Sequence, residues 1–297
     1  MAMDRIQSIA ESTESELERY LEHLGWASNP FARQASMDEY VLPSENSVAD
    51  IANHIRDYTG PVLIHSQYSG VGKTTLLQML LESYADEFTT VGIGEHNVTA
   101  YELIAIVADE LDVGKSSSTK LTERKVANAL EERDQEVLLG VDEFGLNNSD
   151  TLHVIQFLND LDSVRVIMTG MTSQWDAIGG LGSDGRAFQR RVSYELELEP
   201  LTRDQAEELY KRRVATAADV DHGEWASLPM EPLTEGALDV VYERSDGVPA
   251  VIIAAVCDLI GLGAYRYAEV DDATITDEIA KKIEYADPHA DSDQASE

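Results

Sequence analysis

The residues most able to do chemistry lie in one short segment, residues 67–75, with the sequence Gln-Tyr-Ser-Gly-Val-Gly-Lys-Thr-Thr. Glycines let a loop turn so that several backbone N–H groups point into one concavity, where phosphate oxygens bind. An apolar run precedes the segment and a helical pattern begins at Thr74, so a helix N-terminus adds partial positive charge. This order of strand, glycine-rich loop and helix predicts a site for the phosphates of a nucleoside triphosphate.

Each residue of this loop has an expected contact. Lys73 would reach the β- and γ-phosphates, and Thr74 would ligate Mg²⁺ through its hydroxyl. The remaining phosphate contacts are expected from Ser69, Gly70, Val71, Gly72 and Thr75. Gln67 stands where the motif G-x-x-x-x-G-K-[ST] has its first glycine, which is a departure at the start of the turn. The alternative, an ordinary turn with an incidental Gly-Lys-Thr, is disfavoured by the flanking strand and helix.

A second apolar run, residues 137–141, is followed by two carboxylates, Asp142 and Glu143. A strand that is buried on both faces stays apolar and presents its acids at its carboxyl end. There Asp142 is expected to hold Mg²⁺, directly or through water, and Glu143 to polarise the attacking water. The alternative is a solvated acidic turn, but the position of the pair after the phosphate loop favours the catalytic interpretation.

Four further residues are candidates for contacts with the nucleotide. Thr169 follows the apolar run 164–168 and is expected to contact the γ-phosphate or the water, with ordinary turn chemistry as the alternative. Arg190 and Arg191 could reach the γ-phosphate in a neighbouring subunit, or pair with acids on the surface. Pro249 could bring a helix turn against the adenine ring, or simply begin a helix.

The elements that must position these residues alternate in type. Apolar runs predict strands at residues 62–65, 89–93, 136–141, 164–168 and 192–198. Helical patterns separate them at residues 47–58, 74–84, 99–111, 122–133 and 150–161. Strands that alternate with helices of this length form a parallel sheet covered on both faces, so the fold class is α/β.

After Pro200 the pattern contains helices only, at residues 202–215, 234–245, 248–264 and 276–285. An N-terminal helix is also expected, with Thr13 and Glu16 as a capping box. The chain therefore divides into an N-terminal helix and linker, an ATPase core, a helical lid and an acidic disordered tail, at residues 1–46, 47–198, 199–285 and 286–297.

The charge is strongly negative. Lys and Arg total 22 against 56 Asp and Glu, for a net charge of −34, and only seven of the cations are lysines. A disordered acidic protein is contradicted by the 43% hydrophobic content and the clear periodicity. The composition resembles that of proteins from salt-accumulating halophiles. Such a field repels nucleic acid at low salt, whereas in molar salt only local patches of charge count.

Few features of the sequence indicate the cellular compartment of the protein. No apolar run approaches the roughly 18 residues that span a membrane. The N-terminus leads into acidic sequence, unlike a signal peptide. Cys257 is the single cysteine, which excludes an internal disulfide and a multi-cysteine zinc site. A cytoplasmic protein without membrane insertion is expected.

Together these motifs resemble the additional-strand (ASCE) P-loop ATPases, and within them the AAA+ group. The resemblance covers about residues 47–284 and rests on the motifs at 70–75, 141–143, 166–170, 189–191 and 199–202. The segment 24–40, with Asn29-Pro30-Phe31, resembles the entry of ExeA-like and origin-recognition-like (Orc/Cdc6) ATPases. The resemblance implies a five-stranded core with a helical lid, ATP and Mg²⁺ as cofactors, and hydrolysis that drives rearrangement, often in oligomers.

Two departures from the origin-recognition pattern matter. Ala250 stands where those relatives usually carry a sensor arginine, and a short polar tail stands where they carry a winged-helix DNA-binding domain. The run from Gly247 to Ala250 is instead similar to the Gly-x-Pro motif of the signal-transduction (STAND) ATPases, which act as nucleotide switches.

Four functions are therefore considered. The first is an AAA+ ATPase that uses MgATP to remodel a protein partner, with a homo-oligomer as its expected form. The second is a switch that binds ATP tightly and turns over slowly. The third is a DNA-linked initiator or transposition-type ATPase, less favoured because its basic patch, residues 211–213, is short. A small-molecule kinase is disfavoured because the pair Asp142 and Glu143 suits water activation.

Overall fold

The computed structural model describes residues 2–33, 36–94, 98–144 and 149–288. Contacts divide the chain into two compact units. The sheet unit is Leu42–Glu199, and the helical unit combines the segment up to Val41 with the segment from Pro200 onward.

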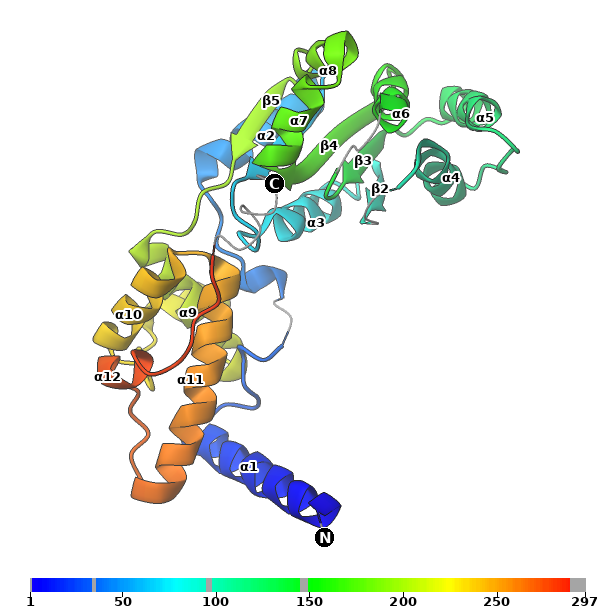
Figure 1. The fold of residues 1–297 in the computed structure, drawn as a ribbon. Helices are drawn as coiled ribbons and strands as arrows, with labels where there is room; N and C mark the ends of the chain where they lie inside the picture. Colours follow the sequence, from blue (N-terminus) through cyan, green and yellow to red (C-terminus); the bar gives the residue numbers. More distant parts are fainter. Residues whose placement is uncertain (1, 34–35, 95–97, 145–148, 289–297) are drawn as a thin grey trace. The chain divides into compact units, whose positions relative to one another are not determined.

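The sheet unit contains one parallel five-stranded sheet in the order β2-β3-β4-β1-β5 (Figure 1). Its strands are β1 (Val62–Ser66), β2 (Thr89–Ile93), β3 (Val137–Val141), β4 (Val164–Met171) and β5 (Tyr194–Glu197). Its helices are α2 (Glu45–Asp57), α3 (Lys73–Ser83), α4 (Ala100–Glu110), α5 (Thr119–Glu131), α6 (Ser149–Asn159), α7 (Thr172–Gly179) and α8 (Gly182–Gln189). The predicted α/β fold with a parallel sheet followed by helices is confirmed.

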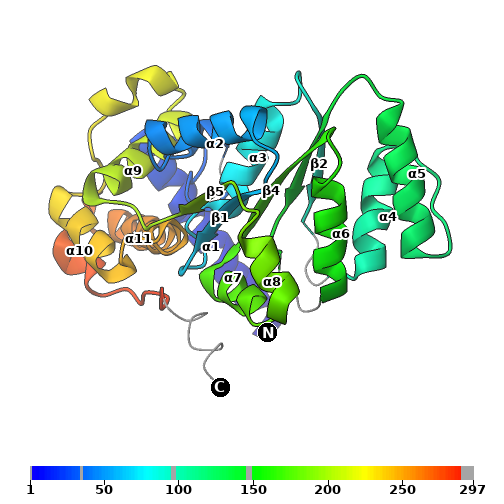
Figure 2. The same cartoon turned by 90° about the horizontal axis from the view of Figure 1, so that it is seen from above.

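The two faces of the sheet are covered by different helices. Figure 2 shows α2 and α3 on one face and α6, α7 and α8 on the other. The three central strands are almost fully buried, as expected for a sheet with helices on both sides. Because all five strands are parallel, the carboxyl ends of β1, β3 and β4 meet at one edge, where ligands bind in open α/β sheets.

The sheet unit differs from the sequence prediction around β4. The strand runs to Met171 rather than ending at residue 168, so Thr169 lies within it. Helices α7 and α8 were not predicted, because they are short and rich in glycine and serine. They form because Trp175, Ile178 and Phe188 are buried in the core of the sheet unit, where tertiary packing outweighs helix propensity.

The helical unit consists of α1 (Ala2–Leu24), α9 (Arg203–Ala217), α10 (Glu235–Ser245), α11 (Pro249–Val270) and α12 (Asp277–Ala280), with short 3₁₀ segments η1 (Met37–Glu39) and η2 (His222–Ser227). α1 contacts α11 through its C-terminal end, where Tyr20 and Leu21 are buried, and its N-terminal part projects away from α11 (Figure 1). Thr13 does not cap α1, because its hydroxyl donates to the carbonyl of Ile9 within the helix. The final helix, α12, is much shorter than the expected 276–285.

The expected linker before residue 47 is largely part of the helical unit. Trp26, Phe31 and Val41 are buried in its core. The rings of Phe31 and Tyr210 stack with their centroids 5.5 Å apart. Loop composition therefore concealed a segment that is packed through a few large apolar side chains.

α11 is the one described helix long and apolar enough to cross a membrane by length and composition, with 22 residues and a window of mean hydropathy 1.5. The sequence analysis predicts a helix at residues 248–264 but no apolar run of membrane-spanning length, because Asp258 interrupts the run. A core helix meets the same criterion, and Ile252, Val256 and Leu259 of α11 are fully buried inside the helical unit. This packing accounts for its apolar composition.

Candidate nucleotide-binding site

The P-loop, residues 67–75, connects β1 to α3. Gly70 and Gly72 have φ angles of 75° and 102°, in the region that side-chain-bearing residues rarely adopt. Gly72 is the N-cap of α3 and has no side-chain oxygen with which to cap the first turn. An anion at this helix end therefore meets no competing side-chain acceptor from the cap residue.

Lys73, the first residue of α3, is held inside the loop. Its side chain is buried, and its Nζ donates to the Tyr68 carbonyl at 3.0 Å and lies 3.6 Å from the Met171 Sδ. Neither of these two partners carries a charge. A phosphate oxygen would bind the ammonium more strongly than either of them, because charge-assisted hydrogen bonds are stronger.

Asp142, at the end of β3, is the point where three elements meet. Its Oδ2 accepts the Thr74 hydroxyl from α3 at 2.7 Å. Its Oδ1 accepts the Thr169 hydroxyl from β4 and the Glu143 N–H, the latter at 3.0 Å. The carboxylate is thereby fixed in orientation before any ligand binds.

These oxygens fit a magnesium ion. Hydroxyl and carboxylate oxygens are the ligands that Mg²⁺ prefers, and Thr74 and Asp142 present one of each at the same point. Within the described residues, no group of three or more His, Cys, Asp or Glu side chains could hold a metal. The pair of Thr74 and Asp142 suits Mg²⁺, which is usually held by one or two protein oxygens together with phosphates and waters.

Glu143 has a strained backbone. Its φ of 44° lies in the left-handed region, where a residue other than glycine costs free energy. The turn is held by its neighbour, because the Phe144 N–H donates to the Thr169 carbonyl at 3.0 Å. Gly170 makes room for this turn, since a Cβ there would lie 2.6 Å from the Phe144 ring.

The other loop candidates lie between β1 and the first turn of α3. Ser69 is exposed, Val71 is buried and Thr75, in the first turn of α3, is half-buried. Thr169 was expected to contact the γ-phosphate or water, and in this structure its buried hydroxyl is directed at Asp142.

The two arginines lie at the opposite ends of the strands from the P-loop. Arg191 forms an ion pair with Asp160 at 2.8 Å, just before β4 begins, and Arg190 is the exposed C-cap of α8. Both positions are at the amino ends of the strands, whereas the P-loop is at the carboxyl ends. A contact of either arginine with a γ-phosphate therefore requires a second subunit.

Pro249 belongs to the helical unit. It occupies the first turn of α11, directly after the N-cap Val248. This placement satisfies the helix-start interpretation of the proline. The expected contact with adenine stays a prediction.

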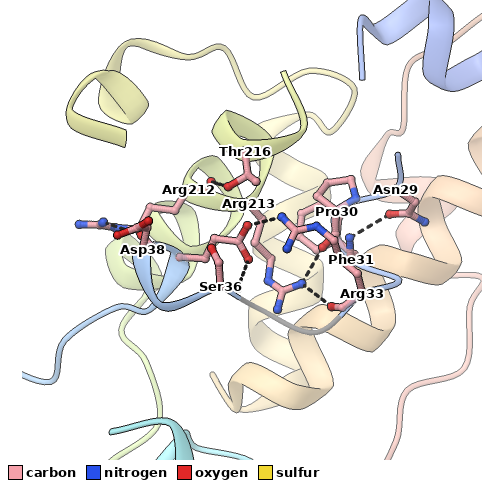
Figure 3. A network of polar contacts seen from close by, with 10 residues as sticks. Asn29, Pro30, Phe31, Arg33, Ser36, Asp38, Arg212, Arg213 and Thr216 are labelled. Atoms are coloured by element: carbon pink, nitrogen blue, oxygen red, sulfur yellow. Dashed lines mark hydrogen bonds and ion pairs between the residues drawn. The ribbon is translucent and has the colours of Figure 1, made fainter. Parts of the chain in front are cut away.

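The basic patch considered for DNA is engaged within the helical unit; Figure 3 shows two of its cations, Arg212 and Arg213. Lys211 and Arg212 each bond a glutamate one turn earlier on α9, at 2.9 and 2.7 Å. Arg212 also donates to the Asp38 carbonyl at 3.1 Å. Arg213 is buried and donates to the Pro30 carbonyl at 2.6 Å. Arg212 thereby connects α9 to η1, and Arg213 connects α9 to the segment before η1.

Sequence reasoning missed a residue beside the P-loop, His65. It is 4% exposed, its Nδ1 lies 2.8 Å from the Thr172 hydroxyl, and its Nε2 lies 3.0 Å from the Glu195 Oε1. The sequence feature that could have indicated His65 is a titratable residue at the end of an apolar strand that leads into the P-loop. Gln67, the departure from the motif, donates to Glu197 of β5 at 3.2 Å.

Comparison with known proteins gives a family match for the sheet unit. Residues 56–178 match the family model described as AAA domain. No curated protein matches the chain by sequence.

Solved structures share the fold. The Aeropyrum pernix ORC2 protein in ADPNP and ADP complexes aligns with a TM-score of 0.60 at 12% identity, over 82% of this chain and 67% of that one. The A. pernix ORC1 protein in complex with DNA gives 0.56 at 14% identity, over 81% and 64%. A mutant of the Thermotoga maritima RuvB protein gives 0.51 at 19% identity, over 85% and 72%. At these identities the likeness concerns the fold alone.

Proposed function

We propose that this chain, whose residues 56–178 match the AAA domain, is an AAA+ P-loop ATPase that binds ATP with Mg²⁺ and hydrolyses it. The observation that carries the proposal is the meeting of α3, β3 and β4 at the Asp142 carboxylate, next to a glycine-rich helix N-terminus. This is the arrangement that binding of a magnesium triphosphate requires.

Each residue has a stated task in this proposal. Lys73 and the P-loop amides bind the phosphates, and Thr74 with Asp142 would hold the metal. Bound Mg²⁺ would neutralise negative charge on the phosphate oxygens during transfer. Thr169 orients the Asp142 carboxylate. Glu143 follows Asp142 directly and is proposed to polarise the water that attacks the γ-phosphate.

We also propose that hydrolysis drives rearrangement of a protein partner, in an assembly of several copies. The position of Arg190 and Arg191 at the edge away from the P-loop supports a role in a neighbouring subunit's site, because neither serves its own. The net charge of −34 supports a working environment of high salt, where such contacts are not overwhelmed by repulsion.

A slow nucleotide switch is the second candidate, favoured by one observation. Ala250, in the first turn of α11, is exposed and offers no cation to a γ-phosphate. A role on DNA has less support. The A. pernix ORC1 structure contains DNA, but here the cations at residues 211–213 are engaged within the helical unit.

The test is steady-state ATP hydrolysis in molar KCl, measured over a range of protein concentrations. Wild type is compared with Glu143→Gln, and with Glu199→Gln as a control that removes an exposed carboxylate outside the site. Turnover per subunit that rises with concentration, is lost in Glu143→Gln and persists in the control supports a shared active site. ATP binding without turnover in wild type would favour the switch, and absence of binding would overturn the proposal.

A further inference from the structure

His65 bridges three elements beside the P-loop. It is the fourth residue of β1 and pairs in register with Gly170 of β4 and Glu197 of β5. Its buried ring contacts Glu195 of β5 through Nε2 and Thr172, the first residue of α7, through Nδ1. One side chain thus connects the edge strand to the helix that follows β4.

The partners of the ring define its tautomer. An ionised carboxylate can only accept hydrogen bonds, so the bond to Glu195 requires a proton on Nε2. In the neutral ring Nδ1 then has no proton, and it accepts a hydrogen bond from the Thr172 hydroxyl at 2.8 Å. Glu195 therefore determines which way the hydrogen bond to Thr172 runs.

Thr172 is directly connected to the candidate site. It follows Met171, whose Sδ lies 3.6 Å from the Lys73 Nζ. Two residues before Met171, Thr169 donates to Asp142. A bond that fixes Thr172 against β1 therefore also restricts the backbone that carries Met171 and Thr169.

We propose that Glu195, His65 and Thr172 form a positioning relay that sets the carboxyl end of β4 against the P-loop and so favours binding of the γ-phosphate. All three are positioning residues, since each acts on the site through another group. The inference rests on the proposed function, because it names what tunes that same site. Its alternative is a histidine that only satisfies buried polar groups.

The first measurement is the ¹⁵N spectrum of the histidine rings in the full chain, which needs no nucleotide. We expect the His65 ring to carry a proton on Nε2, because this nitrogen faces the Glu195 carboxylate. Glu195→Leu should shift it toward a mixture of tautomers, while Glu199→Leu, which removes an exposed carboxylate after β5, should not. A proton on Nδ1 of the neutral ring in wild type would overturn the relay.

The second measurement compares the Kd of ADP with that of a non-hydrolysable ATP analogue. Thr172→Val keeps the shape of the side chain but removes its hydroxyl. We expect the ATP analogue to bind about five- to tenfold more weakly, as for loss of one ordering hydrogen bond, and ADP to bind within about twofold of wild type. Thr172→Ser, which keeps the hydroxyl, should restore the analogue's affinity.

Each other outcome is informative. Equal weakening for both nucleotides would indicate a purely structural role, and unchanged affinities would mean that the hydrogen bond positions nothing; either result overturns the relay. A wild type that binds neither nucleotide overturns the proposed function, and the relay as a tuning device with it. Thermal unfolding of each variant separates loss of fold from loss of positioning.

Discussion

The residue that carries the most strain in the candidate site is Glu143. It is one of five described non-glycine residues with positive φ, and the only one of these that is not an aspartate. The left-handed region is costly for a residue with a long side chain. Strain of this kind clusters at functional sites, where the rest of the structure imposes it. Two hydrogen bonds hold the backbone in this conformation. The Glu143 N–H donates to the Asp142 carboxylate, and the Phe144 N–H donates to the Thr169 carbonyl of β4.

This strain predicts opposite effects on stability and activity. Glu143→Gly should raise the free energy of unfolding by about 1 kcal/mol. Glycine adopts a φ of 44° without strain, and this gain exceeds the entropic cost of ordering a glycine. The substitution should also abolish hydrolysis. Glu143→Gln should abolish hydrolysis with unchanged stability, because the backbone strain remains. Urea titration of the three proteins checks this, and a destabilised glycine variant would contradict it.

Arg213 shows how a buried cation is tolerated at the scale of elements. Desolvation lowers the pKa of its guanidinium, and its side chain is 2% exposed. Its Nη1 donates to the carbonyls of Pro30 and Arg33, and its Cζ lies 5.9 Å from the centre of the Phe31 ring (Figure 3). The guanidinium thus connects α9 to the segment that follows α1.

Removal of this group should destabilise the helical unit. Arg213→Met removes the buried donor to the Pro30 carbonyl and a second bond to the Arg33 carbonyl, for an expected loss of about 2–4 kcal/mol. The neighbouring substitution Arg212→Met is the control. Arg212 is partly exposed, and its loss should cost less than about 1 kcal/mol. Urea unfolding measures both, and equal effects would show that the buried bonds contribute nothing special.

A second prediction for α9 concerns pH. A hydrogen bond from Lys211, reinforced by Arg203, lowers the pKa of Glu207 below its usual 4.5. A carboxyl whose pKa is lower in the folded than in the unfolded state stabilises the fold at pH values above the unfolded pKa. This stabilisation is lost as the pH falls through the folded pKa. The stability advantage of wild type over Glu207→Gln should therefore be constant near neutral pH and vanish below 4.5. An advantage that grew on acidification would contradict the assignment.

The same scale shows what could be predicted from sequence. The strands and the helices next to the P-loop were predictable because their apolar periodicity is set by burial on a two-sided sheet. Helices α7 and α8 were not, because their few apolar residues, such as Trp175 and Phe188, are buried by tertiary contacts that leave no regular pattern. The segment from Trp26 to Val41 has the composition of a linker for the same reason, because its few buried apolar residues follow no regular pattern.

The candidate site divides in the same way. The pairing of Thr74 with Asp142 follows from motif order, because both motifs end at one edge of a parallel sheet. The bond from Thr169 to Asp142 depends on three further residues of β4 that no local pattern indicated. His65 was overlooked because a single histidine in an apolar strand is typical of ordinary core packing.

For the molecule as a whole, the charge of −34 predicts salt-dependent stability. Mutual repulsion of carboxylates opposes the compact state, and salt screens it. The melting temperature should rise between about 0.1 M and about 2 M KCl, over which the screening length falls from about 10 Å to below about 3 Å. An uncharged osmolyte at equal osmolality is the control. A melting temperature that is insensitive to KCl would contradict the high-salt interpretation.

The placement of Arg190 and Arg191 also restricts the geometry of assembly. The P-loop and these arginines occupy opposite edges of one sheet, so a contact between them joins two different surfaces. Such a contact is head-to-tail. A twofold dimer uses the same patch on both subunits, and one patch does not contain both the P-loop and the arginines. Repeated from copy to copy, it closes into a ring or continues as a helical filament. In a filament, the subunit at one end would have an active site that no arginine completes.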